Sequence, residues 1–296
     1  MDRTSPRAAD AWLAAEVTGQ PLHVEGPWGE AEGSITAPTP PTTGWTRFFA
    51  HARTRTTPVV ALVVPQAAGL ENAARLAMLD DALCAGLLRG GAHVARIRQM
   101  HGPASPPADA SEPASPEDAA HLVNAAAALC TAAAASVPGA RPALAGTWLA
   151  GAVAASASAR FDDLAFLAMA ATPAPELMSR RTPENEDDPA WNASPTLRLV
   201  DALAALAPLE AVTLTRRPVL LLQGAADDGL PATHLEAWRS VLAFTNKSVD
   251  AVEIAYADEL LQTLDAERQP IPDSTVALDL LAATVARWTA AQITAR

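Results

Sequence analysis

The feature that most constrains the fold is a series of short, continuously apolar segments that alternate with helical ones. The clearest are Val59–Pro65 (VVALVVP) and Arg217–Gln223 (RPVLLLQ). Runs of this length and composition are typical of strands that are buried on both faces. Because helical patterns lie between them, the chain predicts a mostly parallel sheet with helices on both faces, connected by right-handed crossovers.

The other expected elements follow the same alternation. We expect further strands over His93–Gln99, Pro142–Ala145, Leu164–Ala171 and Val249–Tyr256. The segments LHVEG and EAEGSIT, on either side of Pro27-Trp28-Gly29, predict a β-hairpin at a sheet edge. The expected helices are Leu70–Arg89, an alanine-rich helix starting near Ser115, a small-residue helix to about Ala159, Leu197–Leu209, Pro231–Phe244 and a last one from about Ser274.

Length and charge narrow the class of protein. The 296 residues fit one domain spanning 1–296, in which we expect residues 1–20 to form a leader and 172–196 a cap-like insertion. The net charge of -12 argues against nucleic acid or an anionic membrane surface as a partner, because both require clustered cations. No signal-peptide pattern and no apolar run of about 20 residues occurs, so we expect a cytoplasmic protein.

The sequence predicts neither a metal site nor a cofactor. Cys84 and Cys130 lie in apolar helical stretches, where core packing is the simplest interpretation, and they lack metal-ligand spacing. The glycine-rich patterns that cradle phosphates are absent. In a parallel sheet, functional residues lie in loops at the carboxyl ends of the strands, and three of those loops carry informative residues.

These three loops resemble the catalytic loops of the α/β-hydrolase superfamily. ALAGTWLAGAVAA (143–155) is similar to the nucleophile elbow, Gly-x-Ser-x-Gly, with Trp148 at the serine position. PVLLLQGAADDGLP (218–231) is similar to the acid loop and places Asp227 at the acid position, beside Asp228. VEIAYADELL (252–261) has the form of the histidine loop, with Glu259 at the histidine position.

This resemblance covers about residues 22–289. It implies an α/β-hydrolase fold with a mostly parallel eight-stranded sheet, an edge hairpin and a short cap loop. VVPQAAGLENAARLAML (63–79) also resembles a segment of hydrolase-like proteins associated with bacterial exosortase systems, through Pro65, Ala68, Asn72 and Arg75. Some of those relatives also lack the elbow serine.

The substitutions remove two of the three groups that a serine hydrolase requires. Trp148 has an N–H donor and no usable nucleophilic lone pair, and Asp227 has no histidine to orient. The residues around Gln66 also differ from the usual oxyanion-hole pattern. His101, in the loop expected after His93–Gln99, is the best candidate general base, with a solvated loop histidine as the alternative.

Other polar residues are weaker candidates. We expect Thr147 to point away from the cleft and His234 to face solvent. Ser156 and Ser158 should lie about two helical turns from the elbow. Asp227 and Asp228 have a structural alternative as caps of the following helix, and the acidic run 184–188 (ENEDD) as the solvated face of a cap loop.

Three functions remain open. The first is a non-hydrolytic binding or accessory protein, beside an enzyme of polysaccharide or envelope metabolism, in which Trp148 either plugs the cleft or forms the floor of a pocket. The second is an esterase-like or lyase-like enzyme with relocated groups such as His101, Asp227 and Glu259. The third is a structural dimer partner of an active paralogue. The partner of the first is a small molecule or a protein, and a homodimer is left open.

Overall fold

The computed structural model describes residues 19–26, 29–38, 57–66, 72–101, 115–179, 194–226, 232–245 and 248–294. These residues form one eight-stranded sheet in the order β1-β2-β4-β3-β5-β6-β7-β8. The strands are β1 (Gln20–Gly26), β2 (Gly29–Thr36), β3 (Val59–Val63), β4 (His93–His101), β5 (Arg141–Thr147), β6 (Leu167–Ala170), β7 (Val219–Gly224) and β8 (Val249–Ile254). β1, β2 and β4 pair antiparallel, and every pair from β4 to β8 is parallel.

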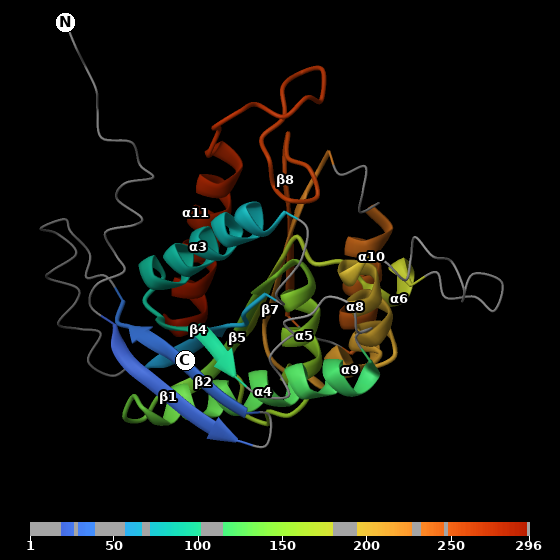
Figure 1. The fold of residues 1–296 in the computed structure, drawn as a ribbon. Coiled ribbons are helices and arrows are strands. Elements are labelled where there is room, and N and C mark those ends of the chain that lie inside the picture. The colour runs from blue at the N-terminus through green and yellow to red at the C-terminus, as the bar shows by residue number, and fades with distance from the viewer. Residues whose placement is uncertain are drawn as a thin grey trace, which may run out of the picture.

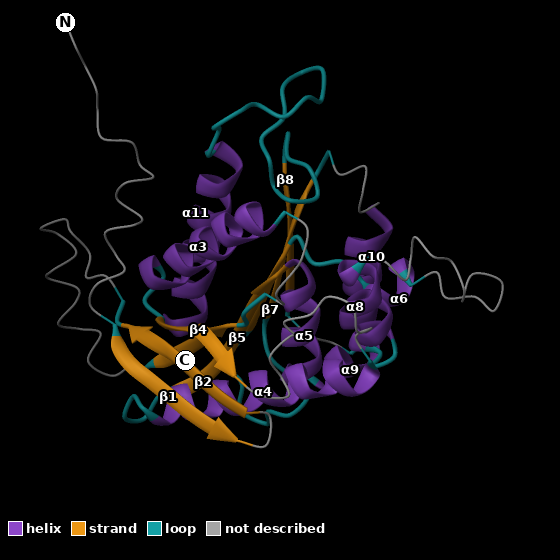
Figure 2. Cartoon of the chain, viewed as in Figure 1, coloured by secondary structure: helices purple, strands orange, loops and turns teal. Residues whose placement is uncertain are grey.

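Helices cover both faces of this sheet (Figures 1 and 2). On one face α3 (Ala73–Arg89) packs along α11 (Val276–Thr294). The other face carries α4 (Pro116–Ala135), α5 (Trp148–Ser158), α8 (Pro195–Ala204) and α10 (Ala232–Phe244), with the short α6 (Pro175–Met178), α9 (Pro208–Ala211) and η3 (Val212–Leu214) beside them. This is the architecture that the resemblance to α/β-hydrolases predicts.

The central strands have the burial that their composition requires. Every residue of β3 and β7 is buried, as expected for strands with helices on both sides. Cys84 and Cys130 are free, buried thiols, which agrees with their interpretation as core residues. Among the described residues, no helix is long and apolar enough to cross a membrane.

Among the element boundaries that differ from those expected, two bear on the site. β4 continues to His101, because β2 pairs with it antiparallel as far as the partners Glu30 and His101. His101 is therefore the last residue of a strand and not part of a loop, which corrects the prediction. β5 extends through Gly146 and Thr147, so the turn into α5 begins at Trp148.

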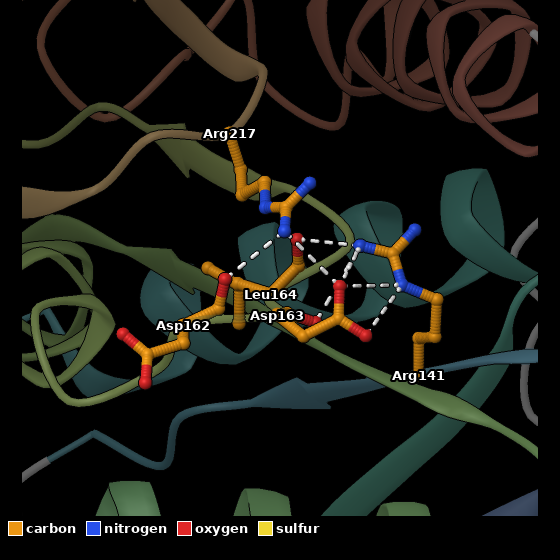
Figure 3. A network of polar contacts seen from close by, with 5 residues as sticks. All are labelled: Arg141, Asp162, Asp163, Leu164 and Arg217. Carbon is orange, nitrogen blue, oxygen red and sulfur yellow. Dashed lines mark hydrogen bonds and ion pairs between the residues drawn. The ribbon is translucent and has the colours of Figure 1, made fainter.

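The amino ends of the parallel strands are joined by a polar network (Figure 3). The Asp163 carboxylate accepts hydrogen bonds from Arg141 at 2.9 Å and from Arg217 at 3.1 Å. The same guanidinium groups donate to the main-chain oxygens of Leu164 and Asp162, respectively. Arg141 is the first residue of β5 and Arg217 precedes β7, so the network connects neighbouring strands at the end of the sheet opposite the elbow.

Candidate active site

The turn between β5 and α5 has an unusual backbone conformation at Trp148. This residue has φ = 49°, in the left-handed region, which is costly for a residue with a Cβ atom. A sharp strand-to-helix turn of this kind exposes the residue at its apex, which is the purpose of a nucleophile elbow. The Trp148 side chain is half-buried and packs against the edge of the hydrophobic core.

Small residues on either side allow this turn to form. A Cβ atom on Gly146 would lie 2.6 Å from the main-chain oxygen of Ala150. A Cβ atom on Gly151 would lie 2.0 Å from Oγ1 of Thr172, in the segment that follows β6. The close approach of strand and helix that the sequence pattern predicts is therefore present.

A buried polar network lies beneath the turn. Thr147, with none of its surface exposed, donates a hydrogen bond of 2.5 Å from Oγ1 to the carboxylate of Asp80 in α3. The amide of Gln66, three residues after β3, donates to Oγ1 of Thr147 at 2.6 Å and to its main-chain oxygen at 2.9 Å. Thr147 thus points away from the apex, as predicted, and links α3, β5 and the segment after β3.

Burial changes the acidity of Asp80. It raises the pKa of this carboxyl from 3.8 to about 6, against the opposing effects of the hydrogen bonds from Thr147 and Gln66 and of the nearby Arg96 charge. Arg96 forms its own ion pair with Asp81 at 2.7 Å. Asp80 is therefore half protonated at a pH slightly below neutrality.

The segment after β8, where the sequence predicts the histidine loop, is attached to α3. Arg75 donates hydrogen bonds to the main-chain oxygens of Leu260, at 3.0 Å, and Leu261. Oδ1 of Asp258 accepts from the main-chain N–H groups of Leu260 and Gln262. Glu259 lies in this turn and is half-buried. Burial lowers the pKa of Arg75, and the Asp258 carboxylate opposes that effect.

Asp227, Asp228 and the acidic run 184–188 lie outside the described residues, and so does the side chain of His101. The backbone of His101 is described, and its register places it opposite Glu30 of the edge hairpin. β4 pairs with β3 only as far as Arg96 and Val63, so His101 lies five residues, or about 16 Å of extended strand, past that pair.

His234 does not face solvent, contrary to the prediction. It is only 4% exposed, and its Nδ1 accepts a hydrogen bond of 3.0 Å from the main-chain N–H of Ala174. In the next turn of α10, Trp238 donates from Nε1 to the main-chain oxygen of Thr172. The helix therefore turns these two side chains inward to hold the segment after β6, and burial lowers the pKa of His234.

The remaining hydroxyl candidates are far from the elbow apex along α5, as expected. Ser156 and Ser158 are both buried. Ser158 donates to the main-chain oxygen of Ala155 and also contacts the hydroxyl of Thr215. Neither serine is positioned as a nucleophile.

An apolar cavity of about 20 Å³ lies beside the turn. It is bounded by residues after β3, in α4 and in α5, among them Pro65, Leu129, Leu149 and Val153. A volume of this size holds about one water molecule.

Sequence reasoning missed the importance of Asp80. It lies on the same face of α3 as Leu76, Leu79, Leu83 and Leu87, all of which are buried. A single acidic residue within an apolar helical stripe is a detectable signal, because a buried carboxyl requires partners. The identity of those partners could not be read from the chain, since Gln66 and Thr147 belong to other segments.

Comparisons with known proteins agree with the fold. No protein-family profile and no curated protein sequence matches the chain. Among solved structures, Est1E from Butyrivibrio proteoclasticus matches with a TM-score of 0.61 at 14% identity, over 93% of this chain and 99% of that one. The esterase domain of a Rhodothermus marinus protein matches with 0.57 at 15% identity (93% and 98%), and an α/β serine hydrolase homologue from Coxiella burnetii with 0.55 at 15% (92% and 97%). The chain therefore has the α/β-hydrolase fold.

Proposed function

We propose that this α/β-hydrolase-fold protein is a non-hydrolytic binding or accessory protein. The observation that carries the proposal is the residue at the strained turn after β5. A tryptophan occupies the left-handed position where hydrolases of this fold present a serine, and its indole offers one N–H donor and no nucleophile.

The strained backbone at Trp148 indicates that the nucleophile-elbow turn has been kept although the residue at its apex cannot act as a nucleophile. A left-handed backbone at a bulky residue costs about 1–3 kcal/mol and persists only where the surroundings enforce it. Here Gly146, Gly151 and the hydrogen bonds of Thr147 hold the turn, and packing of the Trp148 indole against the core contributes apolar burial. We infer that the Trp148 indole fills the space at the apex of the turn.

In the described part of the chain, none of the three candidate bases, Glu259, His101 and His234, is shown to contact a nucleophile. Glu259, at the predicted histidine position, is acidic and part of a turn held by Asp258 and Arg75. His101, the candidate base, is the last residue of β4 and pairs with Glu30 of β2. His234 accepts from a main-chain N–H through Nδ1 and is buried. The esterase-like or lyase-like alternative would require His101 to reach the turn from the end of β4, or Asp227 and Glu259 to act without an imidazole.

If the protein binds a partner at this site, the partner contacts the surface over the turn between β5 and α5. The apolar cavity next to the turn has room for about one water molecule, and we infer that the partner contacts the surface above Trp148. A protein segment or a flat ligand stacked on the indole ring would suit such a surface, because tryptophan combines a large apolar area with a polar N–H. An enzyme of polysaccharide or envelope metabolism is the partner that the sequence resemblance suggests.

Labelling with a serine-directed fluorophosphonate and hydrolysis of a short-chain ester test the proposal. We expect background signals from the wild type and from Trp148→Ser, and at most a trace from Trp148→Ser combined with Glu259→His. Loss of a triad member ordinarily lowers the rate by about four or more orders of magnitude. Trp148→Ala is the matched control, because it creates the same space without a hydroxyl.

Turnover by the wild-type protein that disappears in Asp227→Ala would refute the non-hydrolytic role. Activity in Trp148→Ser alone, and not in Trp148→Ala, would show instead that a base other than position 259 serves the turn. Far-UV circular dichroism of each variant confirms that the comparison is made between folded proteins.

A further inference from the structure

The outer face of the edge hairpin collects one imidazole and three carboxylates. β1 and β2 pair so that His23 stands opposite Glu32, and Glu25 opposite Glu30. Side chains alternate along a strand, and Leu22 and Ala31 on the other face are buried in the core. The four polar side chains therefore share the face that points to solvent, on a two-stranded support and not on a loop.

Three of these side chains converge on one point. Nε2 of His23 lies 3.2 Å from Oε1 of Glu25 and 3.3 Å from Oε1 of Glu30. All three ligand atoms lie within 4.8 Å of one another. Zinc binds histidine nitrogen and carboxylate oxygen at about 2.0–2.2 Å, so neighbouring ligand atoms in a tetrahedral site are separated by about 3.3–3.5 Å. The two distances from Nε2 agree with such edges to within about 0.2 Å, and the two carboxylate oxygens lie within 4.8 Å of each other, so a small side-chain movement would bring all three onto one ion.

The second nitrogen of the imidazole also faces a carboxylate. Nδ1 of His23 lies 4.0 Å from Oε1 of Glu32, the cross-strand neighbour. Metal-binding histidines usually direct their other ring N–H to a carboxylate, which fixes the tautomer and makes the ligating nitrogen more basic. The 4.0 Å separation is longer than a hydrogen bond, so Glu32 acts on the imidazole through its charge alone.

Charge gives the cluster a reason to bind a cation. Glu25 and Glu30 are directly opposite each other across the two strands, where like charges destabilise a sheet. One histidine cannot neutralise three carboxylates, whereas a divalent ion can offset most of their charge. The whole chain carries a net charge of -12, so its field also attracts cations.

We propose that the outer face of the β1–β2 hairpin binds a divalent transition-metal ion through His23, Glu25 and Glu30, with Glu32 supporting the imidazole. Mixed nitrogen and oxygen ligands favour zinc and its neighbours over magnesium and calcium, which prefer oxygen alone. Water completes the coordination, because three protein ligands leave a fourth position open. The three ligands lie within residues 23–30, and the sequence predicted no metal because their spacing is not that of a known metal-binding motif.

Calorimetric titration of the full chain with zinc chloride, in an excess of magnesium, tests the site. We expect one equivalent to bind, and both His23→Ala and Glu30→Gln to remove that binding. Glu32→Gln should weaken it by about tenfold, as expected for a residue that acts through the ligand. His121→Ala is the control, because among the described residues only the Glu117 carboxylate, at 3.9 Å, forms an ion pair with His121.

Nitrogen NMR of the imidazoles gives a second measurement that needs no variant. Zinc should shift the Nε2 resonance of His23 at one equivalent and leave that of His121 unchanged. Equal zinc binding by the wild type and His23→Ala, or no shift at His23, would overturn the proposal. Neither result bears on hydrolysis, so this site and the non-hydrolytic role can fail separately.

Discussion

Replacement of Asp80 by asparagine tests the buried carboxyl in α3 that accepts the hydrogen bond from Thr147 beneath the elbow. Asparagine keeps the shape and an oxygen that accepts from Thr147, and it cannot ionise. In the wild type, burial raises the pKa of Asp80 from 3.8 to about 6. At about 1.36 kcal/mol per pKa unit, this difference corresponds to about 3 kcal/mol between the folded and unfolded chains.

The sign of the effect follows from proton uptake. Between about pH 4 and pH 6 the folded protein keeps the Asp80 proton while the unfolded chain has released it, so the wild type loses stability as the pH rises. Below about pH 4 both states are protonated, and above about pH 6 both are ionised. The Asp80→Asn variant lacks this loss, so its stability relative to the wild type should rise by about 3 kcal/mol across that window.

Urea unfolding followed by tryptophan fluorescence measures the effect, because the chain contains seven tryptophans. The difference between variant and wild type must be plotted against pH, since His234 acts with the opposite sign. Its pKa is lowered by burial, so its contribution to stability is lost as the pH falls from its unfolded value toward its folded one, and it cancels in the difference. A flat difference curve, or a variant that loses stability relative to the wild type as the pH rises, would refute the reasoning.

Two further substitutions test how the site is held together. Arg75→Met keeps the apolar stem and removes two hydrogen bonds to the main-chain oxygens of Leu260 and Leu261. We expect the free energy of unfolding in urea to fall by about 2–3 kcal/mol and amide exchange over residues 257–264 to become faster. Unchanged exchange there would contradict the role of Arg75. Gly146→Ala places a Cβ atom 2.6 Å from the main-chain oxygen of Ala150 and should cost about 1–3 kcal/mol or more. Gly139→Ala, where φ is 72° and nothing lies within 4 Å, should cost only the backbone strain of about 1–2 kcal/mol, and an equal or larger loss there would argue against the close contact at the elbow.

Much of the fold could be predicted because its signals are local. The apolar run of β3, the strand RPVLLLQ and the helix start at Ser115 each depend on neighbouring residues, and in the structure Ser115 and Asp118 form a reciprocal pair of capping hydrogen bonds. The small residues at Gly146 and Gly151 likewise predicted a tight turn before any contact was known. These features require only that the chain be read over a few residues.

The errors arose where distant segments meet. The local sequence predicts a loop at His101 because nothing nearby reveals that β2 extends β4 by antiparallel pairing. It predicts a solvent-facing His234 because the segment that covers this residue, at Ala174, lies 60 residues earlier. Both corrections come from partners that are remote in sequence.

The elbow shows the same division. The sequence by itself determined that a tryptophan stands at the turn after β5 and that small residues flank it, because these are properties of consecutive residues. Only the tertiary structure decided that Trp148 takes a left-handed backbone and that Thr147 is anchored by Asp80 and Gln66. The physical reason is that strain and burial depend on which distant segments pack together, and packing is settled only when the whole sheet has formed.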